Sequence, residues 1–213
     1  TTLSGIDVIS AGTSSATSFV VNQADLLAGG SVIGNAGTDT IEAGDATLNL
    51  ASTTLSSIEV LRGKAAQSTT ITVDSADLAS VTQILGGEAL GDRLVAAGNA
   101  LDLRTTVVSD IEILSAGVST GTVFTVNQAD LRAGGQVRGH VSGSDTLTAG
   151  DTQLDLTQTT LSSIEVLAAG TADATTFTLD ANDLLKLAGG AIRGGASAAD
   201  RLLVTSNDIN LAN

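Results

Sequence analysis

Thr-Thr-Leu-Ser-Ser-Ile-Glu-Val-Leu stands at Thr53–Leu61 and returns letter for letter at Thr159–Leu167. Looser copies begin at Thr1 and at Thr106. The four copies lie 52, 53 and 53 residues apart when they are aligned on the isoleucines Ile6, Ile58, Ile111 and Ile164. The chain is therefore an array of four tandem repeats, and the repeat as a whole decides the fold.

Each repeat is made of short runs of β-branched and alternating residues. In the second repeat these include Ile58–Leu61, Thr69–Val73 and Val81–Leu85, and runs of this kind predict strands. The connections leave no room for crossover helices, so the strands must stack in parallel from one coil to the next. An Asn or Asp followed three residues later by Asp predicts one helical turn per repeat; the four motifs start at Asn22, Asp74, Asn127 and Asp180.

These features predict an all-β fold, a right-handed parallel β-helix, also called a β-solenoid. The two halves of the repeat resemble each other, which predicts a coil of about 26 residues with three strands, two coils per repeat and about eight turns. The absence of Pro agrees, because nearly every strand N–H must donate to a neighbouring coil. We expect a single solenoid domain over residues 1–213, part of a longer array, with repeats at 1–52, 53–105, 106–158 and 159–213.

The amino-acid composition limits the classes of partner and location that the chain can have. Nine basic and 23 acidic residues give a formal charge of −14, which disfavours nucleic acid and anionic membranes and attracts divalent cations. No apolar run is long enough for membrane insertion. A cysteine-free, acidic chain rich in Gly, Thr, Ser and Ala is typical of a secreted bacterial protein. We therefore expect an extracellular location, on the bacterial cell surface.

Four Gly-rich turns each carry an aspartate five or six residues after the first glycine; they run over 34–41, 86–94, 139–147 and 194–202. These turns resemble the nonapeptide G-G-x-G-x-D-x-U-x, with U apolar, of the repeats-in-toxin (RTX) family of type I-secreted bacterial proteins. The surrounding repeats resemble the degenerate repeats of RTX adhesins and surface-layer proteins. The resemblance implies calcium between coils, held by backbone carbonyls and by the motif aspartates, here Asp39, Asp92, Asp145 and Asp200.

The turns also depart from the RTX pattern. RTX nonapeptides follow one another directly, so that adjacent turns supply the six to eight oxygens of each calcium ion, whereas these turns stand singly. The alternative is that glycine provides a tight corner and the aspartate caps it through hydrogen bonds to backbone. We expect this structural role, with calcium as the alternative cofactor. For a simple corner, Asp145→Asn should change the free energy of unfolding by less than about 1 kcal/mol.

Two features could indicate an enzyme. A carboxylate precedes the same apolar position in every repeat, at Asp7, Glu59, Glu112 and Glu165; if these residues stacked two turns apart, neighbours would lie about 9.6 Å apart, near the separation of inverting glycosidase pairs. A residue repeated in every unit is, however, typical of a solvent-facing row. His140 is the only histidine, and no nucleophile-elbow motif accompanies it. We expect no enzyme, and keep a carbohydrate-active β-helix as the second alternative.

The sequence therefore predicts a structural or interaction protein of the bacterial cell exterior: a surface-layer segment, an adhesin spacer or a filament. The first alternative is an RTX-type module that binds calcium and folds on secretion. The expected partners are further copies or repeats that stack head to tail through the end turns, with a cell-surface glycan as the other partner.

Overall fold

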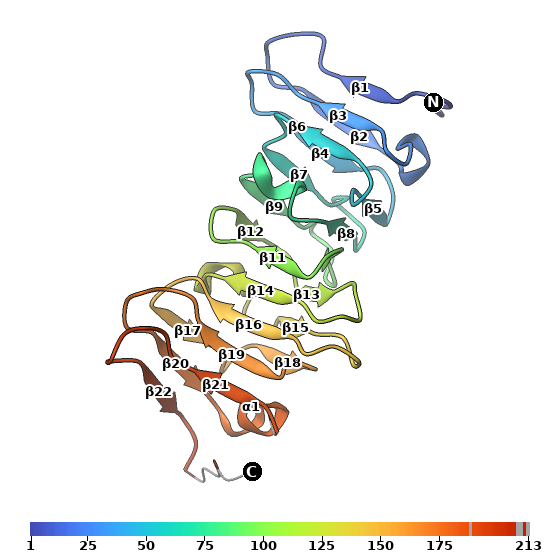
Figure 1. Cartoon of the computed structure of the whole chain (residues 1–213). Helices are drawn as coiled ribbons and strands as arrows, with labels where there is room; N and C mark the ends of the chain where they lie inside the picture. The colour runs from blue at the N-terminus through green and yellow to red at the C-terminus, as the bar shows by residue number, and fades with distance from the viewer. Residues whose placement is uncertain (188, 208–210, 212–213) are drawn as a thin grey trace. The chain divides into compact units, whose positions relative to one another are not determined.

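The computed structural model describes residues 1–187, 189–207 and 211. The chain is an all-β parallel solenoid of about 9 turns with almost no helix (Figure 1). The predicted fold class is confirmed, and right-handedness stays a prediction. Contacts divide the chain into two compact units, residues 1–97 with 105–111 and residues 98–104 with 112–213.

Unit 1 is built from parallel sheets to which the chain returns on every coil. The first sheet has the order β1 (Val8–Ser10), β3 (Ser31–Ile33), β6 (Thr54–Ser56). The second has the order β12 (Val107–Ser109), β9 (Gln83–Leu85), β7 (Val60–Arg62), β4 (Thr40–Ala43), β2 (Ser18–Val21). On the third side, β8 (Thr70–Val73) pairs with β5 (Thr47–Asn49) and with β10 (Arg93–Ala96).

Unit 2 repeats this plan. One sheet has the order β11 (Ala100–Asp102), β14 (Val123–Val126), β16 (Thr146–Ala149), β19 (Val166–Ala169), β21 (Ala191–Arg193). A second has the order β17 (Gln153–Asp155), β20 (Thr176–Leu179), β22 (Arg201–Val204). On the third side, β15 (Gln136–Arg138) pairs with β13 (Ile113–Ala116) and with β18 (Thr160–Ser162).

The coil is shorter than the sequence suggested. Partner residues in neighbouring strands are 23 positions apart at Val8 and Ser31, 20 at Thr40 and Val60, and 25 at Thr176 and Arg201. The predicted coil of about 26 residues was therefore too long, and the chain forms about 9 turns where about eight were predicted. Two coils of this length contain fewer than 53 residues, so one repeat is longer than two whole coils.

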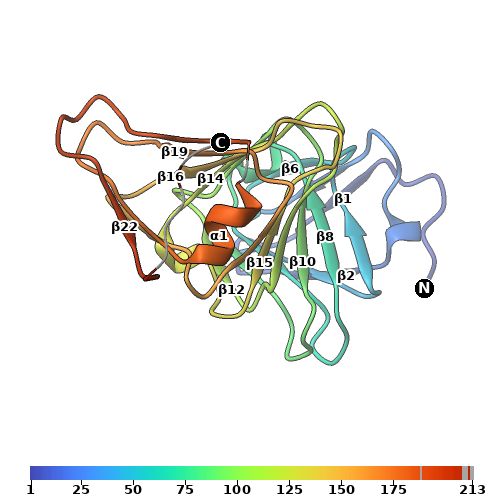
Figure 2. The same cartoon turned by 90° about the horizontal axis from the view of Figure 1, so that it is seen from below.

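The helical turns explain why the 53-residue repeat does not correspond to two whole coils. They lie where the capping motifs predicted them, as η1 (Gln23–Asp25), η2 (Asp77–Ala79), η3 (Gln128–Asp130) and α1 (Ala181–Lys186). Each takes the place of a strand in its coil: η1 packs against β5, η3 against β17 and α1 against β18. Figure 2 shows α1 as a short coiled ribbon among extended segments. The second and third repeats thus each supply six strands and one helical segment, and seven elements do not divide evenly over three sides.

Equivalent residues of successive repeats consequently fall on different sheets. In unit 1, the Thr-Leu-Ser strand β6 lies in the first sheet and its counterpart β12 in the second. Phe19 and Ile71, which occupy the same position of the repeat, do not stack on each other, because Phe19 lies on β2 and Ile71 on β8. Ile71, Phe124 and Phe177 nevertheless lie in the core, because they are at most 2% exposed. Phe19 is half-buried.

Candidate functional site

The Gly-rich turns hold buried aspartates. Asp39, Asp92 and Asp145 are wholly buried, and Asp200 is half-buried. In the third turn, Asp145 Oδ2 accepts the N–H of His140 at 2.8 Å, and Oδ1 accepts the N–H of Thr122 at 2.7 Å. The first bond closes the turn, and the second reaches one coil back. The carboxylate therefore caps its own turn and fastens it to the preceding coil.

The other three turns use the same geometry. Within the turn, the Oδ2 atoms of Asp39, Asp92 and Asp200 accept the N–H of Asn35, Gly87 and Gly195 at 2.7, 2.8 and 2.7 Å. Across coils, their Oδ1 atoms accept the N–H of Thr17, Thr69 and Thr175 at 2.7, 2.6 and 2.8 Å. The capping role predicted as the alternative to calcium is present at all four turns, and the cross-coil bond is an addition that the sequence did not reveal.

The four aspartates are not brought together within either unit. In unit 1, Asp39 precedes β4 of the second sheet, whereas Asp92 precedes β10 on the third side. In unit 2, Asp145 precedes β16 and Asp200 precedes β22, again in different sheets. Among residues 1–187, 189–207 and 211, no group of three or more His, Asp or Glu side chains is arranged to hold a metal ion. A calcium site would therefore need backbone carbonyls for most of its ligands.

The repeated carboxylates before the core strands do not form a row. Asp7 precedes β1 and Glu59 precedes β7 in another sheet of unit 1, while Glu112 and Glu165 precede β13 and β19 on different sides of unit 2. Glu59 Oε2 accepts the N–H of Asp39 at 2.8 Å, and Glu165 Oε2 accepts the N–H of Asp145 at 2.7 Å. The prediction of a solvent-facing row was therefore wrong. Glu59 and Glu165 each accept a hydrogen bond from an aspartate turn in the neighbouring coil.

A second set of aspartates sits in the helical turns. Asp77, Asp130 and Asp183 are at most 4% exposed. Asp77 Oδ2 accepts the N–H of Asp74 at 2.8 Å, and Asp183 Oδ2 accepts the N–H of Asp180 at 2.9 Å. Burial raises the pKa of Asp77 to about 7 against the effect of that hydrogen bond, and the nearby Asp74 carboxylate raises it further. Burial likewise raises the pKa of Asp183 to about 6 against the effect of the Asp180 hydrogen bond, and the Asp180 and Asp155 carboxylates raise it further.

The first helical turn has a different electrostatic balance. Here the capping residue is neutral Asn22, and the N–H groups of Asn22 and Leu3 donate to the Asp25 carboxylate at 3.0 and 3.1 Å. These bonds hold the pKa of Asp25 below 3.8. Burial is the largest cause of the raised pKa values of Asp77 and Asp183, whereas hydrogen bonds from backbone outweigh burial at Asp25.

Two glutamines bridge the helical turns to the following coil. The Gln23 side chain accepts the N–H of Asn49 at 2.6 Å and donates to its carbonyl at 3.2 Å. Gln128 does the same with Asp155, at 2.6 and 3.2 Å. A carboxamide carries the same donor and acceptor as a peptide unit, so each glutamine replaces the strand hydrogen bonds that the helical turn lacks. Sequence reasoning missed this role, although the shared Asn-Gln-Ala-Asp-Leu was a visible signal.

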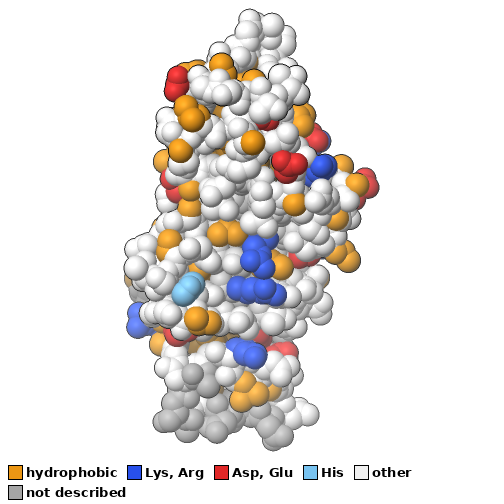
Figure 3. Space-filling model, turned by 90° about the vertical axis from the view of Figure 1, so that its right-hand side faces the viewer, with side chains coloured by type: hydrophobic (Ala, Val, Ile, Leu, Met, Phe, Trp, Pro, Cys, Tyr) orange, Lys and Arg blue, Asp and Glu red, His pale blue; other side chains and the backbone are white. Residues whose placement is uncertain are grey.

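His140 belongs to the third aspartate turn. It is partly exposed, and its Nδ1 accepts the N–H of Ser142 at 3.2 Å. Elsewhere on the surface, much of the face drawn in Figure 3 is neutral and polar, with charged and hydrophobic side chains scattered over it.

No described helix is long and apolar enough to cross a membrane. Comparison with protein-family models, with curated proteins and with solved structures finds no match. The fold and the contacts of the aspartate turns are therefore the basis for a functional proposal.

Proposed function

We propose that this chain is a structural segment of the bacterial cell exterior, serving as a surface-layer segment, an adhesin spacer or a filament. One observation carries the proposal: the carboxylates that recur in the repeat accept backbone N–H groups that hold coils together. Asp145, for example, accepts from Thr122 and His140, and Glu165 accepts from Asp145. Carboxylates engaged in this way support a rod, whereas acid–base catalysis requires a carboxyl group that exchanges protons with a substrate.

We also propose that the chain is not an enzyme. Glu59 and Glu165 are two of the four repeated carboxylates considered for a carbohydrate-active site, and their backbone contacts support a structural role. The test is incubation with neutral and acidic polysaccharides, in which we expect no release of reducing ends or unsaturated products. Turnover that is lost in Glu165→Gln, a variant that keeps an oxygen acceptor for the Asp145 N–H, would contradict the proposal.

An RTX-like calcium module is the second candidate. The observations that favour it are the glycine and aspartate pattern of the turns and the formal charge of −14, which attracts divalent cations. In that case the ion would drive folding, since binding free energy becomes folding free energy. Folding in the presence of a chelator separates the two candidates.

The proposed location is extracellular, on the bacterial cell surface. It rests on the acidic, cysteine-free composition. Antibodies against the segment should label intact cells of the source bacterium, and labelling that appears only after lysis would contradict the location. A cell-surface glycan is the alternative partner to further copies of the chain, and a glycan-binding screen tests it.

A further inference from the structure

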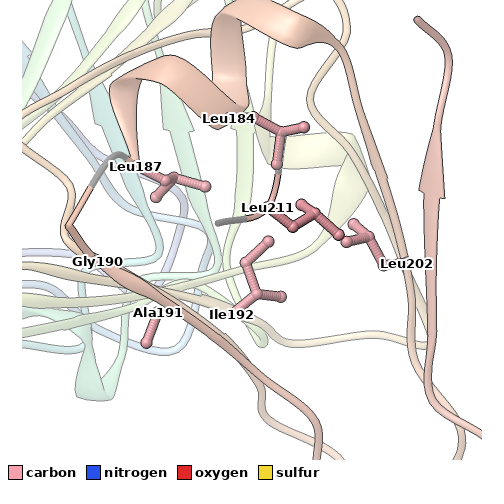
Figure 4. Close-up of a pocket in the computed structure, with 7 residues that line it drawn as sticks. All are labelled: Leu184, Leu187, Gly190, Ala191, Ile192, Leu202 and Leu211. Atoms are coloured by element: carbon pink, nitrogen blue, oxygen red, sulfur yellow. The ribbon is translucent and has the colours of Figure 1, made fainter. Parts of the chain in front are cut away.

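A polar hollow of about 340 Å³ lies between α1 and the coil before it in unit 2. Thr159 and Leu161 line it from the segment that leads into β18 and forms it, and Asp180 and Asp183 line it from α1 and its cap. Leu184 of α1 belongs to a separate, apolar hollow (Figure 4). The side chains that α1 contributes to the polar hollow are therefore hydrogen-bonding groups.

The backbone of β18 directs one amide toward α1. The Thr160 N–H donates to the Gly135 carbonyl at 2.9 Å, on the side of β15. Successive residues of a parallel strand bond to opposite neighbours, so the Leu161 N–H points to the other side. In this coil that side is occupied by α1, which packs against β18. A helix has no strand carbonyls to offer, so the Leu161 N–H needs another acceptor.

The first repeat supplies that acceptor directly, and the fourth repeat does not. In the first repeat, the Leu3 N–H donates to Asp25 Oδ1 at 3.1 Å. Leu161 and Asp183 stand at the same two positions of the fourth repeat, but no such bond joins them. Asp183 is 4% exposed, and its Oδ2 accepts the Asp180 N–H at 2.9 Å. Its Oδ1 is the oxygen left for another donor.

A third polar group in the hollow also lacks a partner. Thr159 is 8% exposed, and its hydroxyl forms no hydrogen bond with the described part of the chain. The hydroxyl of Thr106, at the same position one repeat earlier, donates to the Val81 carbonyl at 3.0 Å. Buried polar groups of this kind are costly unless something else bonds to them. The hollow thus combines a hydroxyl, an amide donor and a carboxylate acceptor that are open to a ligand.

These groups select one ligand chemistry. A group between the Leu161 N–H and Asp183 Oδ1 must accept one hydrogen bond and donate another, and a hydroxyl does both. An ammonium group has no acceptor, and a carboxylate has no proton to donate. The hollow is far larger than the roughly 30 Å³ that one water molecule occupies, and its volume falls within the range of about 300–1,000 Å³ for small-molecule sites.

We propose that the polar hollow binds one sugar residue of a glycan through its hydroxyl groups. One sugar hydroxyl accepts the Leu161 N–H and donates to Asp183 Oδ1, and a second bonds to the Thr159 hydroxyl. The exposed Asn182 and Lys186 side chains also line the hollow and donate to further sugar oxygens. The inference rests on the proposed function, in which a cell-surface glycan is the alternative partner, and it names the binding site.

A nuclear magnetic resonance titration of the full chain tests the site. The probes are glucose, N-acetylglucosamine and glucuronate, each as the free sugar and as its methyl glycoside. At least one methyl glycoside should shift the Leu161 amide resonance saturably. The control is the Leu3 amide, which already donates to Asp25 and should not shift. If no probe shifts the Leu161 amide, the proposal is overturned. Free sugars that bind where their methyl glycosides do not would rule out a glycan as the source.

Removal of one hydroxyl tests the contact itself. Thr159→Val keeps the shape of the side chain and should weaken the binding of the methyl glycoside about tenfold. Thr106→Val is the matched control, because the Thr106 hydroxyl already has a partner within the chain, and its affinity should equal that of the parent. Unchanged affinity in a folded Thr159→Val would overturn the site. If that variant does not fold, the Leu161 resonance of the parent still decides. Failure of this proposal leaves the structural function standing, because folding in a chelator tests that function separately.

Discussion

Thr122 donates its backbone N–H to Asp145 Oδ1 at 2.7 Å, across one coil and 23 residues of chain. Asp145 is wholly buried, and its other carboxylate oxygen accepts the N–H of His140. The contact lies at a Gly-rich turn just before β16, where the regular strand pairing has not yet begun. Loss of the carboxylate would leave the buried N–H of Thr122 and the partly buried N–H of His140 without an acceptor, which costs more free energy than the two bonds contribute.

Asp145→Asn should therefore lower the free energy of unfolding by about 1–3 kcal/mol, because one of the two N–H groups must face an amide donor. This exceeds the change of less than about 1 kcal/mol expected for a simple corner, since that expectation did not include burial or the bond to Thr122. The matched control is Asp151→Asn, an exposed aspartate that accepts from the adjacent Thr152 N–H. Chemical denaturation measures both, and equal effects would contradict the cross-coil role.

Gly139→Ala should destabilise the chain by about 3 kcal/mol or more, because its Cβ would lie 1.8 Å from the Ser163 carbonyl oxygen. The control is Gly98→Ala, where the Cβ would meet nothing within 4 Å; its stability should stay within about 0.5 kcal/mol of the parent. Thermal melting of the two variants makes the comparison. A fully stable Gly139→Ala would mean that the two coils do not approach as described.

The chain should become more stable as pH falls from about 8 to about 5. Asp77 has a folded pKa of about 7, above its ordinary value of 3.8, so the folded state binds the proton more tightly than the unfolded state. The stability from this group is fully present below the unfolded pKa and is lost as pH rises through the folded pKa. Melting temperatures measured across this range should show the trend.

Other acidic groups also affect this pH dependence, so variants must isolate Asp77. Asp77→Asn removes the titrating group and keeps an oxygen for the Asp74 N–H, and its stability should depend less on pH than that of the parent. Asp25→Asn is the control, because the pKa of Asp25 lies below 3.8 and this group stays ionised throughout the range. A pH dependence that is identical in parent and Asp77→Asn would refute the assignment.

Gln128→Ala should lower the free energy of unfolding by about 1 kcal/mol, because two bonds to the Asp155 backbone are lost at a partly exposed site. Hydrogen exchange should report faster exchange of the Asp155 N–H in this variant. Gln83→Ala, at an exposed position on β9, serves as the control and should leave that amide unchanged. An unaltered Asp155 exchange rate in Gln128→Ala would show that the bridge is not formed.

The fold class could be predicted because the repeated Thr-Thr-Leu-Ser segment, the short strands and the missing proline all point to a parallel solenoid. The coil length could not be predicted, because the motif at Asn127 predicted a helical turn but not which part of the coil it occupies. In the structure η3 fills a whole side of a coil and packs against β17. One extra side per repeat moves every equivalent residue to the next sheet, which is why the equivalent Phe residues and the repeated carboxylates do not form ladders.

The candidate site was predicted in part. The sequence pattern of Gly139 and Asp145 was enough to predict a capped turn, since glycine and aspartate favour such turns for local reasons. The acceptor role of Asp145 toward Thr122 depends on how many residues one coil contains, and the spacing of the repeats did not give that number. The hydrogen bond that Glu165 accepts from the Asp145 N–H could not be predicted for the same reason.

The central claim is that buried aspartate turns hold the coils together without a bound ion. Its most direct test is thermal unfolding, followed by far-ultraviolet circular dichroism, in excess chelator and again in millimolar calcium. We expect a cooperative β-sheet transition in chelator and a melting temperature that calcium does not raise. A chain that is unfolded in chelator and folds when calcium is added, with Asp145→Asn losing that response, would contradict the claim and identify an RTX-like calcium module.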